Sequence, residues 1–275
     1  MEINNNTIRL LALDLDDTVL RSDLTISLRT RNAIRKVESA GIEVIVASGR
    51  IPASMDKFVK QLGLHKRNRP LICSNGSIII ESMTGKVTYE AFIPFESALI
   101  VYDLVTAEGF SVQIYEGSTL YVSKQNEFTD YDIKLTGLKQ IVAPDFREKL
   151  IDGCHKLLIP GDPMILQPLM KLLNSYLDKE ITLFTSKPYF LEILPPNVNK
   201  GTALAIVAEK LGISADSVMA VGDSMNDAEM IKWAGIGVAM QNSSESFKQI
   251  ADMVTERSND DDGVADLIEH IFCNR

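Results

Sequence analysis

Short apolar runs of strand length alternate with segments of helical spacing along residues 8–76. The runs lie at residues 8–13, 44–47 and 71–73. Between the first two runs, apolar positions recur at helical spacing after Ser27, which suits a helix N-cap, and before Gly41, which suits a helix end. Residues 52–62 predict a second helix that ends at Gly63. This β-α-β-α-β alternation predicts a parallel sheet with right-handed crossovers.

The pattern changes in the middle of the chain. Strands are predicted at 77–81, 86–90, 111–115, 120–122, 155–159 and 181–185, helices at 94–108 and 164–177, and a loop-rich stretch up to about 153. From Phe190 the alternation returns, with helices at 201–210 and 225–233 and strands at 218–221 and 235–240. We therefore predict an α/β protein with a parallel-sheet core formed by residues 1–82 and 189–275. An α+β domain, residues 83–188, is inserted into that core.

Composition and charge narrow the class of protein. Hydrophobic residues make up 45% of the 275 residues and charged residues 24%, which excludes global disorder. The net charge of −9 disfavours binding to nucleic acid or to anionic membranes. The polar start, Met1–Asn6, does not resemble a signal peptide, and no apolar run approaches the roughly 20 residues of a membrane span. Three cysteines without a CxxC pair suit free thiols, so we expect a cytoplasmic protein.

Acidic residues follow two of the predicted buried strands. Asp14 and Asp16 are two positions apart, and on extended backbone such side chains point to the same side. Asp223 and Asp227 follow the strand at 218–221. If the two strands are neighbours, these four carboxylates converge and repel one another unless a cation or a shared proton intervenes. Oxygen ligands without nearby His or Cys suit Mg²⁺, although a lone Asp-x-Asp is also compatible with helix capping.

Two further segments suit an anion beside that cation. Ser48 and Gly49 lie between a strand and a helix, where backbone N–H groups and a hydroxyl can hold a phosphate. Lys200 opens a predicted helix, a position that the helix dipole disfavours. A local role for Lys200 is therefore plausible beside the simpler interpretation, a solvated surface residue.

Together, these segments resemble a known family. Asp14-Leu15-Asp16-Asp17-Thr18, Ser48-Gly49-Arg50, Asn199-Lys200-Gly201 and Gly222-Asp223-Ser224-Met225-Asn226-Asp227 are similar to the four motifs of haloacid dehalogenase-like (HAD) hydrolases. The inserted α+β domain and Asp262-Gly263-Val264-Ala265 resemble the Cof-type phosphatases with a C2B cap. The resemblance implies a Rossmann-like core with an inserted cap. It also implies a Mg²⁺-dependent phosphatase that acts on small phosphorylated metabolites through an aspartyl-phosphate.

The resemblance also implies a role for each matching residue. Asp14 would be the nucleophile, and Asp16 would protonate the leaving alcohol and then deprotonate the attacking water. The implied Mg²⁺ ligands are Asp14, the backbone carbonyl of Asp16, and Asp223. The implied phosphate-binding and supporting residues are Ser48, Gly49, Lys200, Asn226 and Asp227. The sequence departs from the family in having Ser48 where Thr is common and Asn197 where Gly is common, and both changes keep the needed chemistry.

Several alternatives stay open at this point. A phosphomutase would use the same Asp14, and a phosphonate hydrolase would need a catalytic Lys from the cap. A phosphate-accepting receiver-like module or a non-catalytic phosphometabolite-binding protein would not need Asp16 as an acid. Five residues could contact the leaving group or simply pack in the cap or on the surface: Arg50, Tyr115, Glu116, Lys187 and Tyr189. The protein could be a monomer or a homodimer.

Overall fold

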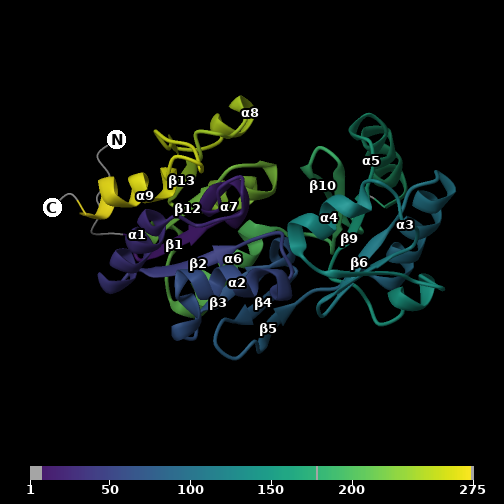
Figure 1. Cartoon of the computed structure of the whole chain (residues 1–275), viewed down its shortest axis with the longest axis horizontal. Helices are drawn as coiled ribbons and strands as arrows, with labels where there is room; N and C mark the ends of the chain where they lie inside the picture. Colours follow the sequence, from purple (N-terminus) through teal and green to yellow (C-terminus); the bar gives the residue numbers. More distant parts are fainter. Residues whose placement is uncertain (1–7, 178, 274–275) are drawn as a thin grey trace.

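Two β-sheets dominate the computed structural model, which describes residues 8–177 and 179–273 (Figure 1). The expected domain ranges and the polar N-terminal segment include some residues that lie outside the described ones. These are residues 1–7, 178, 274 and 275. The larger sheet has eight strands and the smaller has six. Within the described ranges, no helix has both the length and the apolar character that crossing a membrane requires.

The eight-stranded sheet has the order β14-β13-β12-β1-β2-β3-β4-β5. Its strands are β1 (Leu10–Leu13), β2 (Glu43–Ala47), β3 (Pro70–Cys73), β4 (Ile78–Glu81), β5 (Val87–Glu90), β12 (Val218–Gly222), β13 (Ile236–Ala239) and β14 (Met253–Val254). The strands from β14 to β3 are parallel, as predicted, and β4 and β5 form an antiparallel edge. All four residues of β1 are buried, because helices cover both faces of the sheet.

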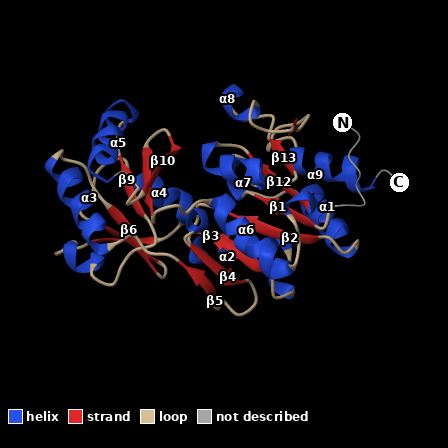
Figure 2. Cartoon of the chain, turned by 180° about the vertical axis from the view of Figure 1, so that it is seen from behind, coloured by secondary structure: helices blue, strands red, loops and turns tan. Residues whose placement is uncertain are grey.

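The helices of this larger unit lie in two layers (Figure 2). On one face lie α1 (Leu28–Ser39), α2 (Pro52–Leu62) and α9 (Gly263–Ile268), and on the other lie α6 (Lys200–Leu211), α7 (Ala228–Trp233) and α8 (Glu245–Lys248). Leu11 and Leu13 pack toward the first layer, and Leu10 and Ala12 pack toward the second. The predicted cap of α1 is confirmed, because the backbone N–H of Thr30 donates to the Ser27 hydroxyl at 2.9 Å.

The six-stranded sheet has the order β10-β11-β9-β6-β7-β8. Its strands are β6 (Gln113–Glu116), β7 (Thr119–Val122), β8 (Lys139–Val142), β9 (Leu157–Pro160), β10 (Thr182–Lys187) and β11 (Phe190–Leu194). Helices α3 (Phe95–Ala107) and α5 (Pro163–Leu177) bury one apolar cluster against it. A second, smaller cluster includes Leu120 and Val122 of β7 together with Ile51, which lies between β2 and α2. This second cluster therefore joins the two sheets.

Shorter helical segments complete the chain. They are Leu15–Val19, Leu64–Lys66, Ser74–Gly76, Arg147–Leu150, Ala215–Ser217, Met225–Asp227 and Glu269–Cys273.

The structure differs from the sequence-based expectation in the middle of the chain. The stretch expected to be loop-rich contains α4 (Thr129–Thr136) and β8. The side chain of Asn126 accepts hydrogen bonds from the backbone N–H groups of Phe128 and Thr129, and this local interaction precedes α4. The residues of α4 show no clear apolar periodicity. Short elements of this kind escape pattern analysis because few residues define their period.

Two strands fall across the expected domain boundaries. The sequence predicts that β5 belongs to the inserted domain, but it pairs with β4 at the edge of the eight-stranded sheet. The sequence predicts that β11 belongs to the core, but it pairs with β9 and β10 in the six-stranded sheet. Both strands belong to antiparallel hairpins, and hairpin pairing keeps each strand in the sheet of its sequence neighbour.

The buried centre of β1 gives a test of this architecture. Leu11→Ala removes a side chain with 0% exposure, so we expect the free energy of unfolding to fall by about 2–5 kcal/mol. Leu28→Ala makes the same change at a side chain with 63% exposure, and we expect a change below about 0.5 kcal/mol. Urea unfolding followed by circular dichroism compares the two variants. Equal losses would contradict the central position of β1.

Candidate active site

The first and fourth sequence motifs meet because β1 and β12 are adjacent parallel strands. Leu13 is aligned with Val221, and the backbone N–H of Asp14 donates to the carbonyl of Val221 at 3.0 Å. Asp14 and Asp223 therefore leave the sheet at the same edge, the carboxyl ends of the strands, where ligands of α/β proteins gather. The condition for convergence, that the two strands are neighbours, is therefore met.

A buried lysine joins these motifs. The Nζ atom of Lys200 donates to Oδ1 of Asp14 at 2.5 Å and to Oδ1 of Asp227 at 2.6 Å. Lys200 and Asp227 have no exposed surface. Burial alone would lower the pKa of Lys200, but Asp14 and Asp227 outweigh it and raise that pKa above its ordinary value. Lys200 is therefore a fixed positive charge and not a surface residue.

The start of α6 fixes the backbone of this lysine. Asn199 caps the helix by accepting from the backbone N–H of Thr202 at 2.9 Å, and the Thr202 hydroxyl accepts from the Asn199 N–H at 3.1 Å. Asn197, in the turn before it, has a left-handed φ of 60°, which an Asn tolerates as expected.

Asp227 also shapes the loop that carries Asp223. Its Oδ2 atom accepts from the backbone N–H groups of Asp223 at 3.1 Å and Ser224 at 3.2 Å. A Cβ atom on Gly222 would lie 2.5 Å from Cγ of Asp227, so only glycine allows this close packing. Asp227 thus connects Lys200 to the turn after β12.

Three carboxylates form a group suited to a metal ion. Ligand oxygens of Asp14, Asp223 and Asp227 all lie within 4.8 Å of one another. Burial raises the pKa of Asp14 to about 7, against the effect of Lys200, and burial and the charge of Asp14 raise the pKa of Asp223 well above its ordinary value. An all-oxygen group whose charges repel one another fits a hard divalent cation. Both oxygens of Asp227 already accept hydrogen bonds, so Asp14 and Asp223 are the better ligands.

Asp16 does not join this group, which corrects the expectation that four carboxylates converge. Its two oxygens accept from Nε and Nη2 of Arg50 at 2.8 and 2.6 Å. Asp17 follows with a left-handed φ of 56°, so the chain turns directly after Asp16. The two-pronged guanidinium contact holds the Asp16 carboxylate beside the group and not within it. Arg50 also donates to the carbonyl of Leu135 at 2.8 Å.

The second motif forms the loop after β2. Ser48 is fully buried, and its hydroxyl accepts from the backbone N–H of Arg50 at 3.2 Å. Gly49 faces the cavity, and a Cβ atom there would lie 2.9 Å from the side-chain amide of Asn75. Gly49 therefore brings bare backbone to the cavity, while Ser48 supports the loop from behind.

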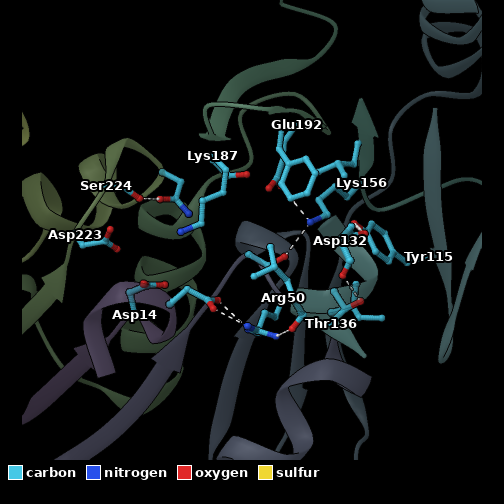
Figure 3. A pocket seen from close by; sticks show the side chains of 18 residues that line it. Asp14, Arg50, Tyr115, Asp132, Thr136, Lys156, Lys187, Glu192, Asp223 and Ser224 are labelled. Atoms are coloured by element: carbon cyan, nitrogen blue, oxygen red, sulfur yellow. Dashed lines mark hydrogen bonds and ion pairs between the residues drawn. The ribbon is translucent and has the colours of Figure 1, made fainter. Parts of the chain in front are cut away.

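A cavity lies between this edge and the six-stranded sheet. Its lining includes both faces: Asp14, Asp16, Gly49, Arg50, Ile51, Tyr115, Asp132, Leu135, Thr136, Lys156, Leu158, Ser186, Lys187, Phe190, Glu192, Asp223, Ser224 and Asn226. Figure 3 shows Asp14 and Asp223 on one side, with Lys187 reaching toward them. Ser48, Lys200 and Asp227 are buried behind the lining and not in it.

The second sheet contributes polar groups that are linked to one another. The hydroxyl of Tyr115 donates to Oδ2 of Asp132 at 2.7 Å, and Nζ of Lys156 lies 3.2 Å from Oε2 of Glu192. Burial raises the pKa of Tyr115 well above its ordinary value, so it remains a hydrogen-bond donor. Burial also raises the pKa of Asp132, and Lys156 opposes that rise.

Asparagine side chains connect this wall to the fourth motif. The amide of Asn75 donates to Oε2 of Glu192 at 2.9 Å, and its carbonyl accepts from Asn226 at 3.1 Å. The carbonyl of Asn226 accepts from the Ser224 hydroxyl at 2.7 Å. Asn226 itself lines the cavity.

The five undecided candidates divide into two sets. Arg50, Tyr115 and Lys187 line the cavity. Glu116 pairs with Lys149 at 3.0 Å, and the ring of Tyr189 packs at a tilt against that of Tyr131. Neither residue lines the cavity.

Residues that were not predicted from the sequence include Asn75, Asp132, Lys156 and Glu192, whose side chains line the cavity or bond to those that do. Asn75 lies two positions after a predicted strand, so the rule that selected Asp14 and Ser48 also points to it. Glu192 is a lone charge in the apolar run 190–194, and such a charge usually has a buried partner. Asp132 lies in the stretch predicted as loop, where no signal was available.

Comparison with known proteins agrees with this geometry. The family model for haloacid dehalogenase-like hydrolases matches residues 11–268. The chain is 32% identical over 267 residues to 5-amino-6-(5-phospho-D-ribitylamino)uracil phosphatase YcsE of Bacillus subtilis (strain 168), covering 96% of this chain and 95% of that protein. Phosphatase YwpJ of the same organism is 28% identical over 289 residues, covering 96% of this chain and all of that protein (100%).

Solved structures give the same result. A haloacid dehalogenase-like hydrolase from Bacteroides thetaiotaomicron superposes with a TM-score of 0.88 at 32% identity, covering 96% of this chain and 100% of that one. A haloacid dehalogenase-like hydrolase from B. subtilis gives a TM-score of 0.84 at 26% identity, covering 96% and 99%. The fold and enzyme class predicted from the sequence are confirmed at the level of the family. The chain belongs to the haloacid dehalogenase-like hydrolases, a family in which its named relatives are phosphatases.

Proposed function

We propose that this protein is a Mg²⁺-dependent phosphatase that hydrolyses small phosphorylated metabolites through an aspartyl-phosphate on Asp14. The observation that carries the proposal is the buried Lys200, held between Asp14 and Asp227 behind a cavity that also exposes Asp223. Lys200 attracts a negatively charged phosphoryl group to the buried carboxylate of Asp14, which is then placed to attack it as a nucleophile. The phosphatase names of two relatives support the activity, and the small phosphorylated compound in the name of YcsE supports the substrate class.

The proposed reaction has two steps on the chain's own residues. A carboxylate oxygen of Asp14 attacks phosphorus, the bond to the leaving oxygen breaks, and Asp16 gives that oxygen its proton. Asp16 then takes a proton from water, the water oxygen attacks phosphorus, and the bond to Asp14 breaks to release inorganic phosphate. Lys200 and the backbone at Gly49 stabilise the phosphoryl oxygens, and Arg50 holds Asp16 in place.

Asp14, Asp223 and the backbone carbonyl of Asp16 are the proposed Mg²⁺ ligands. Bound Mg²⁺ would offset the repulsion between the carboxylates and the negative charge of the phosphoryl group. Asp227 supports this arrangement through its bonds to Lys200 and to the backbone of Asp223.

We propose that the chain divides into a core and an inserted cap, with boundaries that differ from those expected from the sequence. The cap then begins after β5 and ends after β11, because each strand stays in the sheet where it pairs.

Lys187 argues against a phosphonate hydrolase. It reaches from the second sheet and pairs with Asp17. Burial would lower the pKa of Lys187, but Asp17 outweighs burial and raises it. A lysine that forms a covalent imine must lose its proton, and this environment favours the protonated form.

Replacement of the nucleophile is the first test. Asp14→Asn keeps the size of the side chain but removes the attacking carboxylate, so we expect phosphate release from p-nitrophenyl phosphate to fall on the order of 10⁴-fold. Asp56→Asn, at an exposed pair with Lys60, is the control and should keep wild-type activity. Mass spectrometry of acid-quenched wild type should show one added phosphoryl group at Asp14. Full activity in Asp14→Asn would exclude the proposed mechanism.

Metal dependence is the second test. We expect EDTA to abolish phosphate release and added Mg²⁺ to restore it. Asp223→Asn should raise the Mg²⁺ concentration for half-maximal activity by about tenfold or more, because a charged ligand is lost. Asp216 is exposed and lies just before β12 begins, at the opposite end of the strand from Asp223. Asp216→Asn should therefore leave the Mg²⁺ concentration for half-maximal activity unchanged. An unchanged Mg²⁺ requirement in Asp223→Asn would remove Asp223 from the metal site.

The Arg50 contact gives a third test. Arg50→Lys keeps the charge but loses the two-pronged contact with Asp16, so we expect kcat to fall by about 10- to 100-fold through misplacement of the acid–base group. Arg147→Lys, at an exposed pair with Asp103, is the matched control. Steady-state kinetics on p-nitrophenyl phosphate separates the outcomes. An effect on KM alone would show that Arg50 binds substrate and does not position Asp16.

A further inference from the structure

Asn75 is buried where three parts of the molecule meet, and the proposed phosphatase chemistry assigns it no role. Its side chain is 1% exposed and lies behind the cavity lining. It bonds to Glu192 of β11 on one side and to Asn226 of the fourth motif on the other. Figure 3 shows Glu192 on the second sheet and Ser224, which bonds to Asn226, near Asp223. Asn75 is therefore the middle of a chain of side chains between the two sheets.

The backbone at this position has an uncommon conformation. Ser74 and Asn75 both have left-handed φ angles, 49° and 55°. Their N–H groups donate to the carbonyls of Arg50 at 2.8 Å and of Ser48 at 2.9 Å. Such conformations cost free energy in residues other than glycine, and they persist where surrounding contacts fix them, often at functional sites. The turn thus ties Asn75 to the loop after β2.

The charge of Glu192 decides which end of the Asn75 amide faces it. Glu192 is 4% exposed, and its Oε2 atom lies 3.2 Å from Nζ of Lys156. An ionised carboxylate accepts hydrogen bonds and donates none. Asn75 therefore presents its NH₂ group to Glu192, at 2.9 Å. This arrangement leaves the Asn75 carbonyl for its other neighbour.

Asn75 in turn decides the direction of the Asn226 amide. The carbonyl of Asn75 only accepts, so Asn226 presents its NH₂ group to it, at 3.1 Å. The Ser224 hydroxyl lies 2.7 Å from the Asn226 carbonyl, but a hydroxyl can donate or accept and therefore sets no direction. Asn226 lines the cavity that contains Asp14, and its NH₂ group has a second hydrogen. The direction of this amide thus depends on Asn75 and on the charge of Glu192.

We propose that Asn75 is a positioning residue that keeps an N–H of Asn226 available to the phosphoryl oxygens. Without Asn75, the Asn226 amide can rotate by a half turn and present its carbonyl oxygen to the phosphoryl group. A hydrogen bond to a charged group is then replaced by repulsion between an oxygen and an anion. This inference rests on the proposed phosphatase function, because that function brings a phosphoryl group into the cavity.

Removal of the Asn75 side chain tests this role. Asn75→Gly suits the left-handed backbone but deletes both hydrogen bonds, so we expect kcat/KM on p-nitrophenyl phosphate to fall by about 10- to 100-fold. Inorganic phosphate, the proposed product, should inhibit less well, with an inhibition constant raised by about fivefold or more. Asn32→Gly makes the same change at an exposed position of α1 and should keep both values. Thermal unfolding of each variant reports whether it is folded.

Two double variants test the acceptor at position 75. Asn75→Asp combined with Glu192→Gln keeps one carboxylate in the buried chain and an acceptor for Asn226, whereas Asn75→Gly combined with Glu192→Gln keeps neither. We expect kcat/KM of the first double variant to exceed that of the second by about tenfold. Asn75→Ser, whose side chain is too short to reach both partners, replaces Asn75→Gly in both comparisons if the glycine variant is unfolded.

The outcomes separate the two proposals. Unchanged kcat/KM in folded Asn75→Gly would overturn the inference and leave the proposed function intact. A fall in kcat with an unchanged inhibition constant for phosphate would also overturn it, because that result indicates a loss of active protein and not of a phosphate contact. Equal kcat/KM in the two double variants would do the same. Absence of phosphate release by the wild type with Mg²⁺ would overturn the proposed function, and the inference with it.

Discussion

The buried ammonium group of Lys200 is the constraint on which the rest of the site depends. A lysine without exposed surface is stable only when its charge is matched by well-placed carboxylates, and here Asp14 and Asp227 supply them. This requirement explains why β1 must lie beside β12, since each of those strands leads into one of the carboxylates. It also explains the glycine at 222, which lets Asp227 approach the backbone. Asp223 is placed as a consequence of the same contacts.

Much of the core, and the first and fourth motifs of the site, could be predicted from the sequence because each depends on short-range patterns. Buried strand runs and glycine helix ends define the parallel sheet, and the carboxyl-end rule then selects Asp14 and Asp223. The direction of Asp16 could not be predicted, because it depends on the position of the Arg50 guanidinium. Asp132, Lys156 and Glu192 were missed for a similar reason. They lie on a short helix, before β9 and on β11, and tertiary contacts decide how those strands pair.

Polar contacts join the second sheet to the loops that follow β1 and β2. Lys156 donates to the carbonyl of Gly49, and Lys187 pairs with Asp17. An apolar contribution comes from Ile51 against the face of β7. Interfaces of this kind resemble transient protein–protein contacts, which separate more easily than a continuous apolar core. The position of the second sheet is therefore coupled to the geometry of the loops that follow β1 and β2.

The insertion also has a consequence for the order in which the molecule forms. Every strand of the six-stranded sheet lies between residues 113 and 194, so the ribosome delivers this sheet as one continuous segment. β1 is made first, but its partner β12 emerges only after the whole inserted segment has left the ribosome. The smaller sheet can therefore be complete while Asp14 still waits for Lys200 and Asp227. Asp14, Lys200 and Asp227 can therefore meet only late in synthesis, and a chain that ends before β12 holds the six-stranded sheet without this group.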